Sequence, residues 1–266
     1  MRTLFEIAKS GLYASERSLS VTANNIANAD TPGYSRQRVE KSAIGQQMPG
    51  YFAGLGVNVE RIERLRDDMT DKQLINKRQE MGFMQEKIRI YEMLESSLAS
   101  DTGADLDMRI GSFFDAFSEL SNDPQDHSVR FNLVTEAAML TEKLGDMSLN
   151  LDRIKNLTKD STTTLISQIN DNLRDISALN KSITTSKALG RPDHASMDLQ
   201  VKKIEELSQL VDIDTQEAKN GATEIFINGI QVVYGDQYRD ITPSVNESLG
   251  TYEMYLGNGI QVQPQG

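Results

Sequence analysis

The chain has 266 residues, with 28 basic and 39 acidic side chains and no cysteine. The formal charge of −11 opposes binding to nucleic acid or to an anionic membrane, because like charges repel. The absence of cysteine excludes disulfides, thiol nucleophiles and cysteine-based metal sites. The N-terminus has no apolar signal region, and no stretch approaches the roughly 18 apolar residues that span a bilayer.

Residues 3–29 are predicted to form an amphipathic helix. Large apolar residues recur every seven positions, at Phe5, Leu12, Leu19 and Ile26, and the matching d positions of the heptad are small. Two interpretations follow. The helix is either an ordinary core-facing helix of a globular domain, or one that becomes ordered only against partners.

The sequence changes character after this helix. Pro32 and Gly33 are suited to the two central positions of a type II turn, which would end the helix. Residues 34–44 and 54–62 then alternate with a period of two, with Val57, Val59 and Ile62 on one side. We expect two short extended segments joined by the Gly/Pro-rich residues 45–56.

Three helices are predicted between residues 64 and 188. The first covers 64–100, a shorter one follows the interruption at 101–103, and the last is a continuous helix of about 60 residues, or ~90 Å. Heptad rows support the first and last helices. These rows are Leu74, Met81 and Ile88; Met84, Tyr91 and Leu98; and Ile169, Ile176 and Ile183.

The remainder is predicted to be a short helix over 196–211 followed by β structure. Asn228-Gly229 and Asn258-Gly259 are two-residue hairpin signals. The fold class is therefore mainly α, an elongated bundle of long heptad helices with a small β-rich piece at the C-terminal end. Four regions are expected: 1–33, an assembly helix and turn; 34–62, extended; 63–210, helical; and 211–266, the β-rich piece.

No catalytic constellation is evident. The two histidines, His127 and His194, are interpreted as solvated loop residues, and an enzyme would need them in one shared cleft. Adjacent acidic residues such as Asp67 and Asp68 face different directions on a helix, so they do not form a general acid–base pair. We expect no enzymatic activity, no metal and no cofactor.

The asparagines of "ANNIANADTPGY" can be placed on the heptad. Asn25 falls at position g beside the apolar row, whereas Asn24 and Asn28 lie one turn apart on the outer face. A buried amide at a helix contact fixes register, because a shifted register loses its hydrogen bonds. Simple capping of the helix end is the alternative interpretation.

The same segment resembles the N-terminal motif of the axial proteins of the bacterial flagellum, a family of rod, hook and hook-associated proteins. "YSRQRV", "GLGVNVERIERLRDDMTDKQLINKRQE" and "FINGIQVVYG" resemble its hook-associated branch, which joins hook to filament. The resemblance implies a structural subunit exported through the flagellar type III apparatus without a cleaved signal peptide, and located in the extracellular flagellum. The residues that it implies for assembly are Phe5, Leu12, Leu19, Asn24, Asn25, Ile26, Asn28, Pro32, Gly33, Tyr34, Arg36 and Gln37.

Partners follow from the resemblance in the same way. They are the hook protein on one side, the next junction protein on the other, further copies of the chain in a ring, and an export chaperone, without nucleic acid or membrane. The family also implies a second heptad helix at the end of the chain. Because this sequence ends in "GNGIQVQPQG", we expect a truncated form or one lacking that helix. The alternative functions are a rod or hook subunit and a cytosolic coiled-coil adaptor or chaperone.

Overall fold

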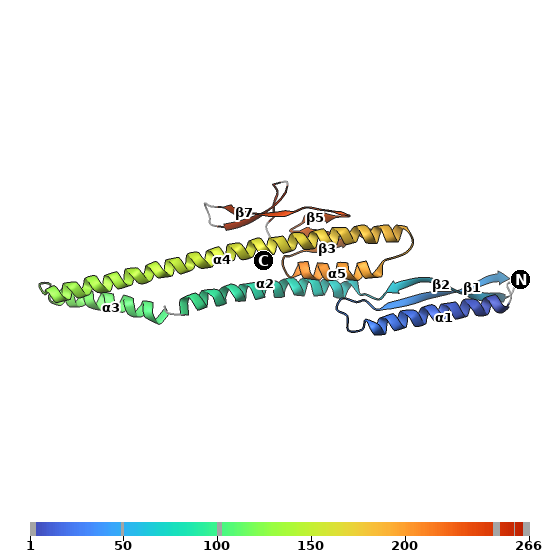
Figure 1. The fold of residues 1–266 in the computed structure, drawn as a ribbon, viewed down its shortest axis with the longest axis horizontal. Coiled ribbons are helices and arrows are strands. Elements are labelled where there is room, and N and C mark those ends of the chain that lie inside the picture. Colours follow the sequence, from blue (N-terminus) through green and yellow to red (C-terminus); the bar gives the residue numbers. More distant parts are fainter. Residues whose placement is uncertain (1–3, 49–50, 100–102, 247–250, 258, 263–266) are drawn as a thin grey trace. The chain divides into compact units, whose positions relative to one another are not determined.

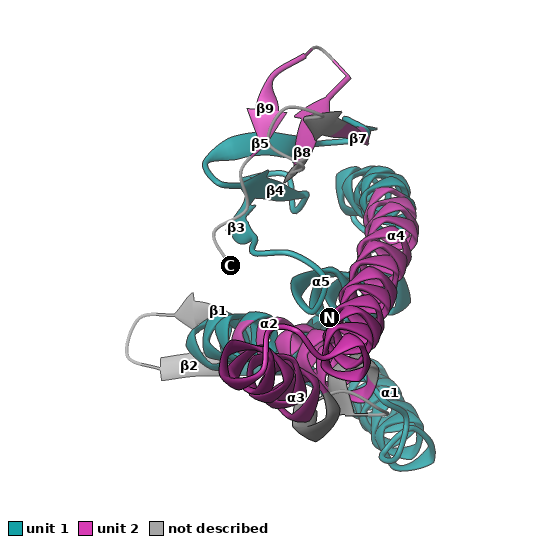
Figure 2. Ribbon diagram, turned by 90° about the vertical axis from the view of Figure 1, so that its left-hand side faces the viewer, with its two compact units in different colours: residues 1–79, 171–240, 265 teal, residues 80–170, 241–264, 266 magenta. Residues whose placement is uncertain are grey.

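The structure, a computed structural model, describes residues 4–48, 51–99, 103–246, 251–257 and 259–262. The fold is mainly helical with small antiparallel sheets towards the C-terminal end, as the sequence predicts (Figure 1). The chain divides into two compact units (Figure 2). Unit 1 contains the described residues within 1–79 and 171–240, and unit 2 contains those within 80–170 and 241–264.

Unit 1 begins with α1 (Leu4–Ala27), which lies along a two-stranded antiparallel hairpin of β1 (Gln37–Met48) and β2 (Tyr51–Arg64) (Figure 1). Helix and hairpin approach closely at Gly56, whose φ is +117°. A Cβ added there would lie 2.3 Å from Ser10 Oγ. The same hydroxyl accepts the Val57 N–H at 3.2 Å, so glycine is what allows α1 to bond to β2.

Two boundaries differ from the sequence prediction. The Gly/Pro-rich residues expected to join the extended segments mostly belong to the strands, and the register shifts between Ile44 and Gly45 absorb the irregularity. Residues 49–50 lie outside the described residues. The second helix, α2 (Asp68–Ala99), starts later than predicted, because Asp67 caps it by accepting the Met69 N–H at 3.2 Å and the Thr70 hydroxyl at 2.6 Å.

The core of unit 1 forms around the C-terminal part of α4 (His127–Ala188), the predicted long helix, which has 62 residues. α5 (His194–Ser208) packs beside α4. A four-stranded sheet in the order β3-β4-β5-β6 is bonded to α4 through Asn180, which also bonds to α5. The strands are β3 (Asp214–Glu217), β4 (Thr223–Ile227), β5 (Ile230–Tyr234) and β6 (Gln237–Tyr238). The fully buried side chains of this core include Leu173, Ile176, Ile183, Leu207, Ile225 and Val233.

Asn180 connects these elements. Its amide group donates to the carbonyls of Thr223 and Gly235 at 2.9 and 2.7 Å. Its Oδ1 accepts the Thr223 N–H at 2.7 Å and the Gln200 amide at 2.6 Å. The side chain is fully buried, and these four bonds satisfy it.

Unit 2 contains the later part of α2, the helix α3 (Gly103–Asn122) and the first part of α4. It also contains the sheet of β7 (Ile241–Asn246), β8 (Thr251–Leu256) and β9 (Gln261–Val262). Asn170 on α4 attaches this sheet by bonding to both the N–H and the carbonyl of Ile241, each at 2.8 Å.

The first predicted hairpin turn is confirmed. Asn228 and Gly229 have φ values of +49° and +74° and connect β4 to β5, which is the geometry that a type I′ turn requires. In the second, Asn258 lies outside the described residues, although Gly259 has a φ of +80° between β8 and β9.

The heptad rows of α2 are more exposed than the heptad row of α4. The side chains of Leu74, Met81, Met84, Ile88 and Tyr91 are exposed, and the side chain of Leu98 lies outside the described part. Ile169, Ile176 and Ile183 of α4 are buried.

Candidate functional site

The hairpin leaves the apolar row of α1 largely uncovered. Phe5, Leu12, Leu19 and Ile26 have 74%, 73%, 71% and 72% of their surface exposed. The face turned toward the hairpin carries smaller residues instead, with Ala14 and Val21 buried and Ser10 bonded to β2. α1 therefore attaches to the body by one face and presents its large side chains on the other.

The Asn25 side chain bonds α1 to the first residue of the hairpin. Its amide group donates to the Gln37 carbonyl at 2.8 Å, and its Oδ1 accepts the Gln37 N–H at 2.9 Å. The same oxygen accepts the Tyr34 hydroxyl at 2.9 Å. One half-buried side chain thus pairs with both backbone groups of the first residue of β1, and a shift in register would break all three bonds.

The turn between them has the predicted form. The Tyr34 N–H donates to the Thr31 carbonyl at 3.1 Å, and Gly33 has a φ of +83°, as a type II turn with Pro32 at its second position requires. Asn28 donates to the Asn24 side chain at 2.7 Å on the exposed side. Asn24 and Asn28 therefore bond to each other, while Asn25 alone of the three reaches the hairpin.

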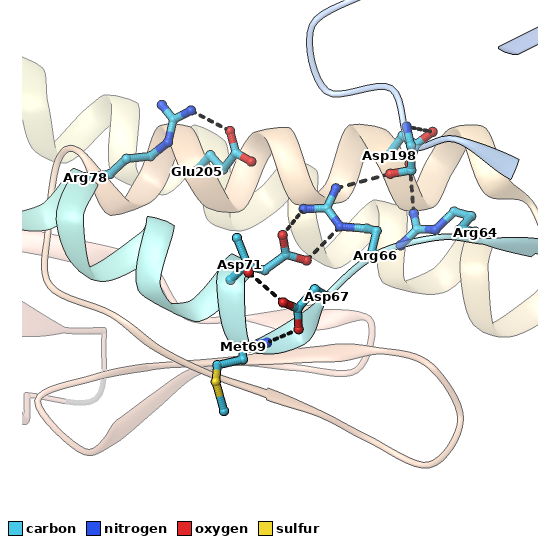
Figure 3. A network of polar contacts seen from close by, with 10 residues as sticks. Arg64, Arg66, Asp67, Met69, Asp71, Arg78, Asp198 and Glu205 are labelled. Carbon is cyan, nitrogen blue, oxygen red and sulfur yellow. Dashed lines mark hydrogen bonds and ion pairs between the residues drawn. The ribbon is translucent and has the colours of Figure 1, made fainter. Parts of the chain in front are cut away.

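A second layer of polar contacts ties the turn to α5. Asp198 accepts the N–H of the buried Ser35 at 3.2 Å through one oxygen, and Arg64 Nη1 at 3.1 Å through the other (Figure 3). Burial lowers the pKa of Arg64, and the negative charge of Asp198 opposes that shift. The carboxylate thus joins three elements, namely the turn, the end of β2 and α5.

The network continues into the start of α2. Arg66 donates twice to Asp71, at 2.7 and 2.6 Å, and once to the Ser35 hydroxyl at 3.2 Å (Figure 3). The hydrogen bonds to Asp71 raise the pKa of Arg66. Arg78 pairs with Glu205 of α5 at 2.8 Å. We call Ser35, Arg64, Arg66, Asp71 and Asp198, together with Asn25, the joint.

His194 belongs to the surroundings of the joint, so its interpretation as a solvated loop residue is wrong. It is the first residue of α5, it is half-buried, and its Nδ1 is buried without a described hydrogen-bond partner. Burial and the positive charge of Arg64 lower the pKa of His194. His127 is exposed at the start of α4.

The predicted residues separate into three groups. Asn25, Tyr34 and Gln37 meet in the joint region, and the Arg36 carbonyl accepts the Leu65 N–H at 2.8 Å. Asn24, Asn28, Pro32 and Gly33 form the helix end and the turn. The four residues of the apolar row contact neither group through any described polar bond.

Sequence reasoning missed Ser35, Arg64, Arg66 and Asp198. The last lies 134 positions from Arg64, and no local pattern links the two. The only signal available was the unusual density of arginines at the end of an alternating strand, at Arg61, Arg64 and Arg66.

The described residues contain no cluster of three or more histidine, cysteine, aspartate or glutamate side chains arranged to hold a metal ion. Across the described ranges, no helix is both long and apolar enough to cross a membrane.

Two family models match this chain. Residues 91–265 match the family described as Flagellar hook-associated protein FlgK helical domain, and residues 5–34 match the Flagella basal body rod protein family. The second match covers the apolar row and the turn.

Flagellar hook-associated protein 1 of Bacillus subtilis is 28% identical over 255 residues, which are 92% of this chain and 49% of that protein. The protein of the same name from Salmonella typhimurium is 25% identical over 265 residues, covering 96% and 47%. The chain thus spans about half the length of the curated relatives it matches.

A solved structure, that of the flagellar hook junction protein FlgK from Burkholderia pseudomallei, has the same fold. The TM-score is 0.61 at 18% identity, and the match covers 72% of this chain and 35% of that one. The chain belongs to the flagellar hook-associated protein FlgK family.

Proposed function

We propose that this chain is part of a structural subunit of the bacterial flagellum that assembles on the hook tip and joins hook to filament. The observation that carries the proposal is the apolar row of α1, four large side chains in heptad register that the hairpin leaves largely exposed. An exposed apolar stripe of this kind favours burial against a partner helix.

In this proposal the apolar row packs in the axial core of the assembly and the joint sets the angle at which α1 leaves the body. The three bonds of Asn25 and the Asp198 contacts support that division, because they hold α1 and the turn without using the apolar row. Asn24, Asn28, Pro32, Gly33 and Arg36 shape the helix end beside it. The helical units and the small sheets would form the outer layers.

The proposed partners are the hook protein on one side, the next junction protein on the other, and further copies of the chain in a ring. An export chaperone would keep the apolar row covered before assembly, and export would use the flagellar type III apparatus without a cleaved signal. The subunit would act outside the cell and would catalyse no reaction.

A rod or hook subunit is the second candidate, and the match of residues 5–34 to the rod protein family favours it. The match of residues 91–265 to the hook-associated family favours the junction role. The assembly assay therefore includes both structures as acceptors.

The test adds the purified full-length protein to isolated hooks that lack junction proteins and to isolated rods, and images the ends by electron microscopy. A cap on hook ends is expected, and bare hook ends would overturn the proposal. Leu12→Ser/Leu19→Ser should abolish the cap, whereas the matched control Ser15→Ala/Ser20→Ala, on the same helix, should not.

Hydrogen exchange on the free protein separates assembly from the third candidate, a coiled-coil adaptor. An assembly helix with an uncovered apolar row should exchange faster over residues 4–24 than the buried part of α4, since only Ala14 and Val21 of α1 are buried. An adaptor would protect this helix as strongly as α4.

A further inference from the structure

Within this sequence, one short backbone segment connects α1 and its hairpin to the rest of unit 1. We call the described residues of α1, the turn, β1, β2 and Leu65 the arm. The Leu65 N–H donates to the Arg36 carbonyl inside the arm at 2.8 Å. α2 begins at Asp68, and Asp67 caps it. Arg66 alone therefore separates the arm from the capped start of α2, so a change in backbone angles at this residue would move the arm as a unit.

No buried apolar side chain lies at the junction between the arm and the rest of unit 1. Among the described residues from 22 to 115, which include the turn, the hairpin and the start of α2, the one buried residue is Ser35. The buried apolar residues of the arm, Ala14 and Val21, are on α1, and those of the core, such as Leu173, are on other elements. The attachment therefore depends mainly on polar contacts, which can break and re-form without opening an apolar core.

Two residues of α5 make these polar contacts with the arm. Asp198 accepts the Ser35 N–H at 3.2 Å and Arg64 Nη1 at 3.1 Å, so one carboxylate bonds to both the turn and the end of β2. A hydrogen bond also joins His194 to the backbone of Ile62. The side chains of Arg64 and Asp198 are 17% and 12% exposed. Loss of either partner would leave the other charge largely buried and unpaired, which destabilises the contact strongly.

Arg66 bonds to both sides of the connection (Figure 3). Its guanidinium donates to Asp71 of α2 at 2.7 and 2.6 Å, and to the Ser35 hydroxyl of the arm at 3.2 Å. A pivot of the arm would break the bond to Ser35, whereas the two bonds to Asp71 would keep the guanidinium paired. The connection can therefore change its conformation without leaving the Arg66 charge uncompensated.

We propose that the arm is a rigid body that pivots at Arg66, and that Asp198 is the latch that holds the arm against α5. While the Asp198 contacts are made, the arm has one orientation. When they break, the arm moves without unfolding, because the bonds of Ser10 and Asn25 inside it remain. The latch is a property of the free chain, so it goes beyond the proposed function.

Distances between pairs of spin labels test the latch in the full chain, since the chain has no cysteine of its own. Asn58→Cys on β2 and Lys181→Cys on α4 are exposed positions, and together they report where the arm lies relative to the core of unit 1. Asn58→Cys and Arg17→Cys, an exposed position on α1, report the arm by itself. With the joint intact, both label pairs should give a narrow distribution of distances.

Asp198→Asn should broaden the arm-to-core distribution and leave the distribution within the arm unchanged. The amide keeps the shape of the side chain but removes the charge that pairs with Arg64. Asp171→Asn is the matched control, because it makes the same change of charge in an exposed pair with Arg174, and it should broaden neither distribution. Arg64→Gln removes the other partner of the latch and should broaden the arm-to-core distribution as well. Circular dichroism checks that each variant is folded.

An arm-to-core distribution that stays narrow in Asp198→Asn would overturn the latch. A distribution within the arm that broadens in either variant would overturn the rigid arm. The capping assay on hook ends plays no part in these measurements, so failure of the latch and failure of the junction role are separate results.

Hydrogen exchange at two backbone amides provides a second readout. Asp198 holds the Ser35 N–H, so Asp198→Asn should raise the exchange rate of this amide about tenfold. The Leu65 N–H bonds to the Arg36 carbonyl inside the arm, so its exchange rate should stay the same. Equal increases at both amides would mean that the arm unfolds instead of pivoting, and would contradict the proposal.

Discussion

The apolar rows of α1 and of the C-terminal part of α4 have the same seven-residue period but opposite surroundings. Ile176 and Ile183 are fully buried, since α5 and the sheet of β4 and β5 pack around that part of α4. Leu12 and Leu19 on α1 keep more than two thirds of their surface exposed. A heptad pattern thus predicts where the apolar stripe of a helix lies, but not what covers it.

On both α4 and α1 an asparagine side chain bonds the helix to a strand, but the two bonds have different consequences. Asn180 and Asn25 each bond through their amide to both backbone groups of a strand residue, Thr223 and Gln37 respectively. On α4 this bond lies on the buried side, next to the apolar row. On α1 it holds the helix by its less apolar face, which leaves the row available to partners.

The largest expected effect is a loss of folding stability on substitution in the buried apolar row of α4. Ile183→Ala should lower the free energy of unfolding by about 2–5 kcal/mol, through lost burial and the cavity left behind. Urea denaturation followed by circular dichroism measures it. A loss no larger than that of Leu12→Ala would remove the distinction between the two rows.

The second effect concerns the attachment of α1. Asn25→Ala removes three hydrogen bonds and leaves the Gln37 backbone groups partly unsatisfied, so we expect a loss of about 1–3 kcal/mol in the opening free energy of α1. Hydrogen exchange on residues 14–27 reports this opening. Asn24→Ala is the matched control, because Asn24 is exposed and, among the residues that the structure describes, its side chain bonds only to Asn28. Equal effects at both positions would contradict the role assigned to Asn25.

These positions also show how far sequence reasoning reaches. Period and turn chemistry predicted α1, the 62-residue α4, the type II turn and the Asn228-Gly229 hairpin, since each depends on residues a few positions apart. The position of Asn25 beside the apolar row could be predicted as well. The bond of Asn25 to Gln37 depends on how β1 returns along the helix, so that bond could not be predicted from the sequence.

The contacts of Asp198 within the joint could not be predicted from nearby residues, for the same physical reason. Asp198 meets Ser35 and Arg64 only because α5 packs on the end of the hairpin, and those residues are separated by 163 and 134 positions. The burial of His194 arises there too. A polar side chain whose partners are set by tertiary packing leaves no periodic trace in the sequence.

A third and smaller effect should appear as a pH dependence of unit 1. The ordinary pKa of histidine is 6.5, and that of His194 is lowered in the folded state by burial and by Arg64. Below pH 6.5 the unfolded chain therefore binds a proton that the folded chain does not, and stability falls as the pH falls. Above pH 6.5 both states are neutral at this residue and the contribution is constant.

Urea denaturation at neutral and mildly acidic pH checks this in matched variants. His194→Gln should reduce the loss of stability on acidification, because the group that takes up the proton is gone. His127→Gln, exposed at the start of α4, should behave as the unsubstituted chain does. If both variants lose stability as the unsubstituted chain does, His194 does not contribute to the pH dependence.

The smallest effect on stability is expected at the exposed row. Leu12→Ser removes a side chain that the folded chain leaves largely in solvent, so the free energy of unfolding should change by no more than about 0.5 kcal/mol. The same substitution should weaken capping of hook ends, because the methyl groups that it removes would be buried only in the assembly. Denaturation and the capping assay on one preparation measure both. A row that stabilises the free chain by several kcal/mol would be a core row like that of α4, and α1 would then no longer differ from it.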